Sequence, residues 1–409
     1  MASKKSKSKS KSRKTKSKSN PAVTLLGLVV VLALGAVYYL TGNDPVGIFS
    51  DTETPTSVAA PDSSNPPSAP PSNNSGSSDW WEVYFTDPVN MDDPEQWQGS
   101  IEEEIIKKIN AAKTSIHIAS FEFDLTPVAE ALVAAKQRGV EVQWVTDDEH
   151  GLESDEEPGH GQFAMLEDAG IEVRSDDRTA LMHNKFWIFD QQMVWTGSTN
   201  ITENGIFDQD NNVLVIYSPE LAAIYEAEFQ EMWNGEFGPR SPSQLASQNT
   251  IVNGSAIQVI FTSEDHAIEE SIVPLLNSAE TSIRFLAFSF TDYPMAKAMI
   301  DRAAVGVDVA GVFEKVGSST DSAELRTLFC ANVPARRDGN GGFMHNKFII
   351  VDERYVATGS LNYSTNAETS NDENVIIIDN PDIARLYMQE FERVWSLAED
   401  PEPEKFPCN

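Results

Sequence analysis

Residues 182–190 read MHNKFWIFD, and the closely similar stretch MHNKFIIVD occupies residues 344–352. Each stretch opens with a histidine and a lysine two residues apart and continues with the aromatic and β-branched residues of a buried strand. Successive side chains of a strand point to opposite faces, so His183 and Lys185 share one face. Burying an ammonium beside an imidazole is costly unless an anion lies there. The two stretches therefore predict two halves of one anion site.

The second stretch belongs to a longer internal duplication. Residues 197–233 align without a gap to residues 359–395, at the offset that also relates the two histidines. Upstream, residues 101–123 match residues 268–290, and the change of offset falls in the acidic loop 147–160. Helical and strand patterns alternate in each copy. The sequence therefore predicts an α/β protein of two tandem α-β-α sandwich repeats, packed with pseudo-twofold symmetry around largely parallel or mixed sheets.

The elements of the first copy can be placed by periodicity and capping patterns. Ser100 and Glu103 have the spacing of a capping box at a helix start. We expect helices at residues 100–112, 127–138 and 219–233 and before Gly170, and strands at residues 115–121, 141–146, 193–196 and 213–217 besides the motif strand. The expected repeats span residues 80–247 and 248–409.

The first 79 residues differ in composition from the repeats. Residues 1–20 form a basic tail without acids, although the formal net charge of the chain is −33. Residues 21–41 carry no charge and are long enough to span a bilayer, and residues 42–79 have the Pro/Ser-rich composition of a disordered linker. The apolar run continues past the small-residue site at 33–35, which favours a signal-anchor over a cleaved signal peptide. The sequence thus predicts a single-pass membrane protein with a cytoplasmic tail and an extracytoplasmic catalytic region, or a secreted protein after cleavage.

The chain has two cysteines, Cys330 and Cys408. In an exported protein they can pair, but the sequence carries no information on the distance between them, so a disulfide and free thiols both remain open. Their spacing does not match that of a structural zinc site. We expect no metal and no cofactor.

The chemistry is carried by a longer motif around each histidine. The two copies read His183-x-Lys185-x4-Asp190-x6-Gly197-Ser198-x-Asn200 and His345-x-Lys347-x4-Asp352-x6-Gly359-Ser360-x-Asn362. A pseudo-twofold arrangement brings both copies together at the interface between the repeats. There the lysines and asparagine amides can bind phosphoryl oxygens, while one imidazole attacks phosphorus and the other protonates the leaving oxygen. The lysine charges stabilise the transition state, so this chemistry requires no metal.

This doubled motif resembles that of the phospholipase D superfamily, HxKxxxxD-x6-GSxN, and the resemblance covers residues 82–396. Within the superfamily the chain looks similar to the compact bacterial endonucleases and the mitochondrial cardiolipin hydrolases. The resemblance implies a phospholipase D-type fold and a metal-independent phosphodiesterase that works through a covalent phosphohistidine. By analogy His183 is the nucleophile and His345 the general acid, although the reverse assignment remains open.

The resemblance also implies roles for the remaining motif residues. Lys185, Lys347, Asn200 and Asn362 would bind the phosphate with help from Ser198 and Ser360, and Asp190 and Asp352 would be structural partners outside the pocket. Glu373 matches the family's acidic residue that orients a catalytic histidine, whereas the first copy has Asn211 there. This asymmetry suits two histidines with different roles, because a carboxylate raises the pKa of a neighbouring imidazole.

The substrate is less well specified than the chemistry. Hydrolysis of phospholipid head groups is the preferred hypothesis, with nucleic-acid cleavage and cardiolipin-synthase-type phosphatidyl transfer as alternatives. The acidic chain lacks the basic stripes on which nucleic-acid binding relies. A non-catalytic binding module is disfavoured because neither copy has lost its histidine or lysine. We expect a phospholipid as partner, nucleic acid as the alternative partner, and a monomer, because one chain holds both motifs.

Overall fold

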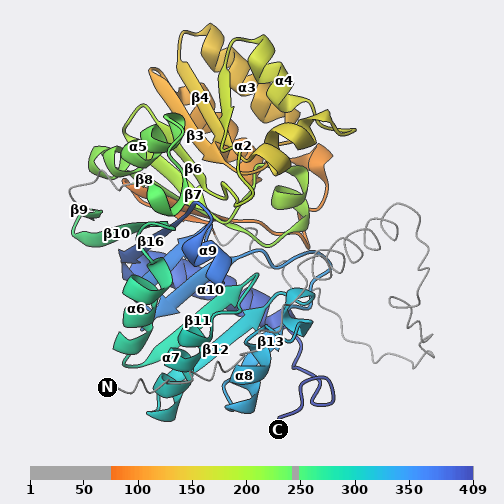
Figure 1. The fold of residues 1–409 in the computed structure, drawn as a ribbon, viewed down its shortest axis with the longest axis vertical. Helices are drawn as coiled ribbons and strands as arrows, with labels where there is room; N and C mark the ends of the chain where they lie inside the picture. The colour runs from red at the N-terminus through yellow and green to blue at the C-terminus, as the bar shows by residue number, and fades with distance from the viewer. Residues whose placement is uncertain (1–74, 242–247, 409) are drawn as a thin grey trace, which may run out of the picture. The chain divides into compact units, whose positions relative to one another are not determined.

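The computed structural model describes residues 75–241 and 248–408, which belong to one compact unit. Within these residues the chain forms two eight-stranded sheets with the same succession of strands (Figure 1). The first has the order β1-β2-β8-β7-β6-β3-β4-β5, and the second, taken from its other edge, has the order β9-β10-β16-β15-β14-β11-β12-β13. The prediction of an α/β protein with two tandem sandwich repeats is therefore confirmed.

The first repeat contains the motif strand β6 near the middle of its sheet. Its strands are β1 (Gly76–Ser77), β2 (Trp81–Phe85), β3 (Ser115–Ser120), β4 (Glu141–Thr146), β5 (Glu172–Ser175), β6 (Lys185–Phe189), β7 (Met193–Gly197) and β8 (Asn212–Tyr217). Its helices are α2 (Ile101–Ala111), α3 (Thr126–Gln137), α4 (Gln162–Asp168) and α5 (Pro219–Trp233). The helix at 100–112 begins as expected, but Glu103 accepts from the backbone of Gly99 at 2.6 Å and the Ser100 hydroxyl forms no cap.

The second repeat follows the same plan around the motif strand β14. Its strands are β9 (Asn249–Val252), β10 (Ser255–Thr262), β11 (Ser282–Ala287), β12 (Asp308–Phe313), β13 (Ala335–Arg337), β14 (Lys347–Val351), β15 (Tyr355–Gly359) and β16 (Glu373–Asp379). Its helices are α6 (Val273–Ser278), α7 (Tyr293–Ala304), α8 (Leu325–Cys330), α9 (Thr365–Thr369) and α10 (Pro381–Leu397). Both sheets are mixed: β3-β4-β5 and β11-β12-β13 run parallel and the other neighbours antiparallel.

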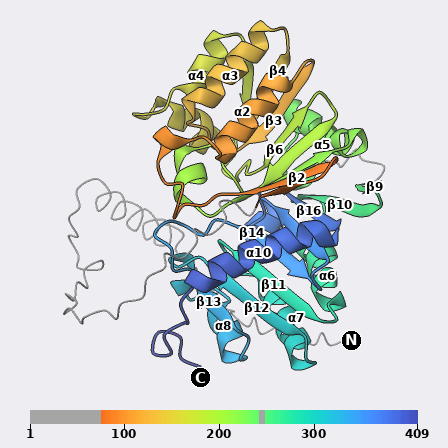
Figure 2. The same ribbon diagram turned by 180° about the vertical axis from the view of Figure 1, so that it is seen from behind.

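The helices lie in layers on both faces of each sheet. Apolar residues of α2, α3 and α4 form one core with the first sheet, and those of α6, α7 and α8 form another with the second. The inner faces of both sheets share a third core with α5 and α10, to which Tyr225 and Tyr387 contribute fully buried rings. Figure 2 shows α10 lying across the second sheet. The two repeats are thus joined by a continuous apolar core, so each can supply side chains to one shared site.

A tight hairpin returns the chain from each motif strand. Asp190 and Gln191 both have positive φ, near 52° and 54°, as do their counterparts Asp352 and Glu353. This left-handed pair matches the twist of antiparallel strands and is tolerated by Asp. The return strand ends at Gly197, where φ is 150° and a Cβ would lie 2.2 Å from the carbonyl oxygen of Asn212. The motif glycine is therefore required for the close contact between β7 and β8.

The two cysteines form a disulfide, which settles a question that the sequence left open. Cys330 at the end of α8 is bonded to Cys408, with the Cα atoms 5.4 Å apart. The bond ties the C-terminal segment to the outer helices of the second repeat.

The predicted membrane topology needs correction. No helix within residues 75–241 and 248–408 is long and apolar enough to cross a membrane. This finding contradicts the single-pass localisation with a membrane anchor and an extracytoplasmic or secreted catalytic region. The tail at 1–20, the apolar segment at 21–41 and most of the linker at 42–79 lie outside the described residues. The described strand β1 lies within the segment that was expected to be a disordered linker.

Candidate active site

The backbone of each motif histidine is held by the other repeat. The amide of His183 donates to the carbonyl of Asp372 over 2.9 Å, and that of His345 donates to Asp210 over the same distance. Asp372 and Asp210 occupy corresponding places immediately before Glu373 and Asn211. Parallel β-bridges join Met182 to Asp372 and Met344 to Asp210. They place the start of each motif stretch next to Glu373 or Asn211 of the other repeat.

Four buried asparagines extend these contacts into the interface. Asn374 donates its side-chain amide to Asn184 over 2.9 Å, and Asn212 donates to Asn346 over 2.8 Å. Asn184 and Asn346 stand between the histidine and the lysine of each motif, where the sequence analysis treated them as spacers. All four are fully buried, so losing one would leave a partner without its hydrogen bond. Asparagine stands at both positions in each copy of the duplication, and this repetition was the sequence signal that could have predicted the interface hydrogen bonds.

The two histidines face different acceptors. Nδ1 of His183 lies 2.7 Å from Oε2 of Glu373, and Nδ1 of His345 lies 2.9 Å from Oδ1 of Asn211. The side-chain amide of Asn211 donates to the Gly205 carbonyl over 2.9 Å, which turns Oδ1 toward the imidazole. Each acceptor comes from the opposite repeat. With the ring proton on Nδ1, both imidazoles keep a lone pair on Nε2.

Electrostatics at the centre differ from the expectation that a carboxylate raises an imidazole pKa. Burial, followed by the charges of Lys185 and Lys347, lowers the pKa of His183 well below its usual value. Burial and the same lysines also lower the pKa of His345. Burial raises the pKa of Glu373 to about 8, against the opposing effect of Lys185. Desolvation and like charges therefore outweigh the carboxylate, and neutral imidazoles are favoured.

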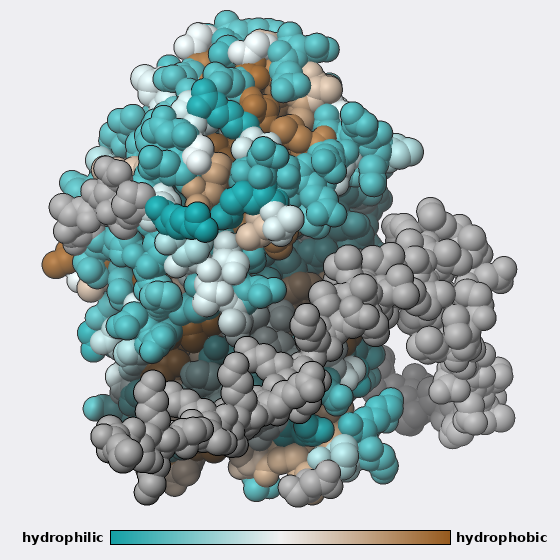
Figure 3. Space-filling model, viewed as in Figure 1, coloured by the Kyte–Doolittle hydropathy of each residue, from teal (hydrophilic) through white to brown (hydrophobic). Residues whose placement is uncertain are grey.

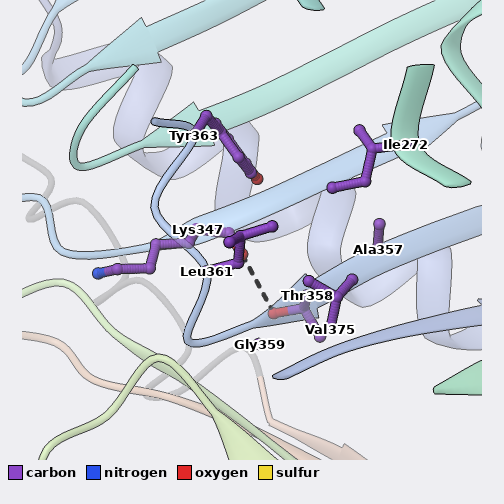
Figure 4. Close-up of a pocket in the computed structure, with 8 residues that line it drawn as sticks. All are labelled: Ile272, Lys347, Ala357, Thr358, Gly359, Leu361, Tyr363 and Val375. Carbon is purple, nitrogen blue, oxygen red and sulfur yellow. Dashed lines mark hydrogen bonds between the residues drawn. The ribbon is translucent and has the colours of Figure 1, made fainter. Parts of the chain in front are cut away.

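The two lysines are held in the same way in each half. Nζ of Lys185 donates to the carbonyl of His183 over 2.9 Å, and Lys347 does so to His345 at the same distance. Both lysines are 2% exposed. Figure 4 shows the Lys347 side chain extending away from a small cavity lined with apolar residues, including Leu361. Burial lowers the pKa of Lys185 to about 8 and that of Lys347 well below its usual range, so an anion near these groups would favour their charged forms.

Two phenylalanines that the sequence analysis did not single out complete the centre. The ring of Phe121 lies 4.8 Å from that of His183 and 4.9 Å from Nζ of Lys185. Phe288 lies 4.6 Å from His345 and 4.7 Å from Lys347 in the same arrangement. These rings exclude water and offer their faces to the ammonium groups. Their matched positions in the duplicated 101–123 and 268–290 segments could have identified them.

The serines of the GSxN segments contact the groups behind the histidines. Ser198 donates to Oδ1 of Asn211 over 2.7 Å, and the Ser360 hydroxyl hydrogen-bonds to Glu373. Both serines are fully buried. They are therefore placed to orient the histidine partners, and direct phosphate contact by either stays a prediction.

The asparagines of the same segments have unequal surroundings. Asn200 donates its amide to Oε2 of Glu122 over 2.9 Å. The second repeat has Ser289 at the position of Glu122. Asn200 and Asn362 alike leave a buried Oδ1 without a hydrogen bond among the described residues. The first half of the site thus carries an additional acid. Phosphate binding by these amides also stays a prediction.

The motif aspartates lie at the opposite end of each strand from the lysine. Asp190 accepts hydrogen bonds from the backbones of Lys113, Thr114 and Ser115 at 2.6–3.1 Å. Asp352 accepts the corresponding bonds from residues 280–282. These bonds tie the turn after the first helix to the motif strand, which indicates a structural task for both residues.

Replacing Asp190 with alanine should therefore affect folding and leave catalysis intact. Because several charge-assisted hydrogen bonds are lost, we expect the free energy of unfolding to fall by about 2 kcal/mol. The value of kcat for the folded variant should stay within roughly twofold of that of the parent chain. Urea unfolding and steady-state kinetics test this, with Asp168→Ala on the exposed end of α4 as control. A fall in kcat as large as that of a histidine variant would contradict the assignment.

Comparisons with known proteins show which family the two repeats belong to. The family described as cardiolipin synthase, PLD-like domain, matches residues 105–233 and 272–395. The mitochondrial cardiolipin hydrolase of Xenopus tropicalis is 34% identical over 133 residues, which cover 32% of this chain and 63% of that protein. A phospholipase D of Rickettsia conorii is 34% identical over 114 residues, covering 28% of this chain and 57% of that protein. The chain thus spans less than two thirds of the length of these relatives.

Solved structures give a further likeness. Nuc of Salmonella typhimurium, a phospholipase D family member, is 32% identical to this chain. The match covers 36% of this chain and 99% of Nuc, with a TM-score of 0.34. The phosphatidylserine synthase of Haemophilus influenzae is 13% identical, and the match covers 80% of this chain and 90% of the synthase. The TM-score of 0.58 shows that the two proteins share a fold. Since the family match covers both repeats with their histidine–lysine strands, the chain belongs to the phospholipase D superfamily.

Proposed function

We propose that this chain is a phosphodiesterase that hydrolyses phospholipid head groups through a covalent phosphohistidine. The observation that carries the proposal is the pairing of His183 with Glu373 and of His345 with Asn211 across the repeats, beside both lysines. Such a centre holds a nucleophile, a proton donor and positive charge within one enclosed site.

The reaction runs in two displacements. Nε2 of His183 attacks phosphorus and forms a P–N bond, while the bond to the head-group oxygen breaks and that oxygen takes a proton from His345. A water then gives its proton to His345 and attacks phosphorus, the P–N bond breaks, and phosphatidate leaves. Lys185 and Lys347 stabilise the charge on the phosphoryl oxygens in both transition states. His345 ends protonated and His183 neutral, as in the substrate complex, where the anionic phosphodiester offsets the lysine charges and favours the protonated form of His345.

The unequal partners support His183 as the nucleophile. Its ring becomes cationic in the phosphohistidine, and the Glu373 carboxylate at 2.7 Å stabilises that charge. His345 must both lose and regain a proton in each turnover. The neutral amide of Asn211 favours the charged ring less strongly than a carboxylate does, which suits this exchange.

Acidic side chains beside the site favour a phospholipid over nucleic acid. The carboxylates of Glu122 and Asp147 both act on the charge of Lys185. Although burial alone would raise it, the pKa of Asp147 is lowered, because His150 donates to its carboxylate over 2.9 Å. Hydrophilic residues also dominate the face shown in Figure 3, on a chain with a net charge of −33. Such surroundings repel a polyanion and suit a cationic or neutral head group.

The relatives support either substrate class. The named cardiolipin hydrolases and phospholipase D favour a lipid, whereas endonuclease activity or phosphatidyl transfer would use the same phosphohistidine. Transfer differs only in the acceptor, an alcohol in place of water.

The purified full chain should be offered vesicles of phosphatidylcholine, vesicles containing cardiolipin, and single-stranded DNA, each in the presence of EDTA. We expect phosphatidate from at least one lipid and no cleavage of the DNA, with His183→Ala as the blank. Faster cleavage of DNA than of any lipid would show a nuclease instead. Loss of activity in EDTA while circular dichroism shows an intact fold would contradict the metal-independent mechanism.

A further inference from the structure

Three glutamates form a second cluster of charge where the repeats meet. Glu228 and Glu231 lie on α5 of the first repeat, and Glu264 follows β10 of the second. One carboxylate oxygen from each lies within 4.8 Å of the others. Glu228 is only 5% exposed and has no hydrogen bond or ion pair with any residue that the structure describes. Oε2 of Glu264 is buried and likewise has no hydrogen bond within the described ranges.

The duplication provides an internal comparison for this cluster. The counterparts of Glu228 and Glu231 on α10 are Glu390 and Arg393. The guanidinium of Arg393 donates to both oxygens of Glu390, at 2.8 and 2.7 Å, and also pairs with Asp210 of the first repeat. A cation therefore joins the repeats at this position in one half. In the other half a carboxylate, Glu231, stands where the guanidinium would be.

A nearby arginine does not replace the missing charge. Arg178 pairs with Asp372, the counterpart of Asp210, and with Asp176. Arg178 thus already serves two carboxylates. The three glutamates lie close together beside Asp372, whose charge acts on Glu228. The neutral hydroxyl of Ser241 donates to Oε2 of Glu231 over 2.9 Å and also lowers the pKa of Glu264. Crowded buried carboxylates require either protons or a cation, because their mutual repulsion is weakly screened.

We propose that Glu228, Glu231 and Glu264 bind a hard divalent cation, calcium in the first instance, in the place that the Arg393 guanidinium occupies in the other half. Calcium accepts carboxylate oxygens in flexible geometry and completes its shell with water. Burial, with the charges of neighbouring acids, raises the pKa of Glu228 well above its usual value, and burial raises that of Glu264 to about 8. A bound cation would reverse both shifts and join α5 to the loop after β10.

The cation has a structural role distinct from the phosphodiesterase chemistry. Asp372 lies between the cluster and the active site: its carbonyl holds the backbone of His183, and its carboxylate acts on Glu228. Linking the repeats here would stabilise the segment that carries Glu373. Because the readouts below are binding and thermal stability, they do not depend on the proposed substrate or mechanism.

The test uses the full chain after EDTA treatment and desalting, with CaCl2 and MgCl2 added separately. We expect calorimetry to show one calcium per chain and saturating calcium to raise Tm by about 5 °C. Glu228→Gln should lose the calorimetric signal and the Tm shift. Glu130→Gln at an exposed position of α3 removes the same charge and should keep both.

A second variant copies the other half of the protein. Glu231→Arg places a guanidinium opposite Glu228, as Arg393 stands opposite Glu390, so it should raise Tm without calcium and abolish the response to calcium. Glu130→Arg makes the same change of charge and should keep the calcium response. Absence of any heat of binding or Tm shift with either metal would overturn the proposal and indicate carboxylates that share protons. An equal Tm shift in the parent chain and in Glu231→Arg would also overturn it.

Discussion

Replacing His183 with alanine is expected to lower kcat toward every phosphodiester by on the order of 10⁴-fold or more, because the nucleophile itself is lost. The effect should be the same for substrates with good and poor leaving groups, since no P–N bond can form. Steady-state kinetics with a phospholipid and with a p-nitrophenyl phosphodiester measure it. His160→Ala, at an exposed position in the acidic loop, is the matched histidine control and should retain full activity.

His345→Ala should behave differently with the two substrates. With the phospholipid, kcat should fall by roughly 10²–10⁴-fold, because the head-group oxygen leaves without a proton. With the p-nitrophenyl ester the leaving group needs no acid, so a burst of about one p-nitrophenol per chain should precede slow turnover. Mass spectrometry should then detect a phosphoryl adduct on His183. A burst in His183→Ala and none in His345→Ala would reverse the two roles.

Glu373→Gln is expected to lower kcat by about 10³-fold. The amide keeps the size of the side chain but cannot ionise when the ring of His183, 2.7 Å away, becomes cationic, so the phosphohistidine is less stabilised. Glu373→Asp keeps the charge at a longer distance and should lose less activity. Glu270→Gln, at an exposed position in the helical segment directly before α6, serves as the charge control. A kcat for Glu373→Gln within threefold of the parent's would show that the carboxylate does not act on His183.

The stability of the same variant should depend on pH in a defined direction. Burial raises the pKa of Glu373 to about 8, so the folded protein holds a proton that the unfolded chain releases near its ordinary carboxyl pKa. The contribution of the Glu373 proton to the free energy of unfolding is fully present below the carboxyl pKa of the unfolded chain. It is lost as the pH rises through the pKa of Glu373 in the folded protein. Relative to the parent chain, Glu373→Gln should therefore become progressively more stable between about pH 5 and pH 9. Urea unfolding across this range measures the difference, and a difference that shrinks with pH would contradict the shift.

The duplicated motif allowed much of the fold to be predicted. The two-residue period of a strand predicted that His183 and Lys185 share one face, but β6 begins only at Lys185, so His183 lies just before the strand and its backbone is held by Asp372. The sequence predicted sheets that are either largely parallel or mixed, because the alternation of helices and strands along the chain does not specify how the strands pair. The membrane topology was wrong because it rested on the hydropathy of residues 21–41, while no described helix can cross a bilayer.

Other features of the candidate site depend on contacts between distant segments. Glu373 was predicted from the family resemblance to be an orienting acid, but the sequence did not say which histidine it faces, because the contact with His183 joins positions from different repeats. The low imidazole pKa likewise depends on how completely the packed sheets remove water around Lys185 and Lys347.

The amino-acid sequence was sufficient for the superfamily, the two-repeat α/β fold and the residue types of the site, because these follow from short-range periodicity and an exact doubling of motif spacing. Packing between the repeats was needed for the partner of each histidine, the phenylalanine rings over the lysines, the disulfide and the glutamate cluster. These features join residues far apart in the chain, and local sequence patterns carry no information about which distant side chains will meet.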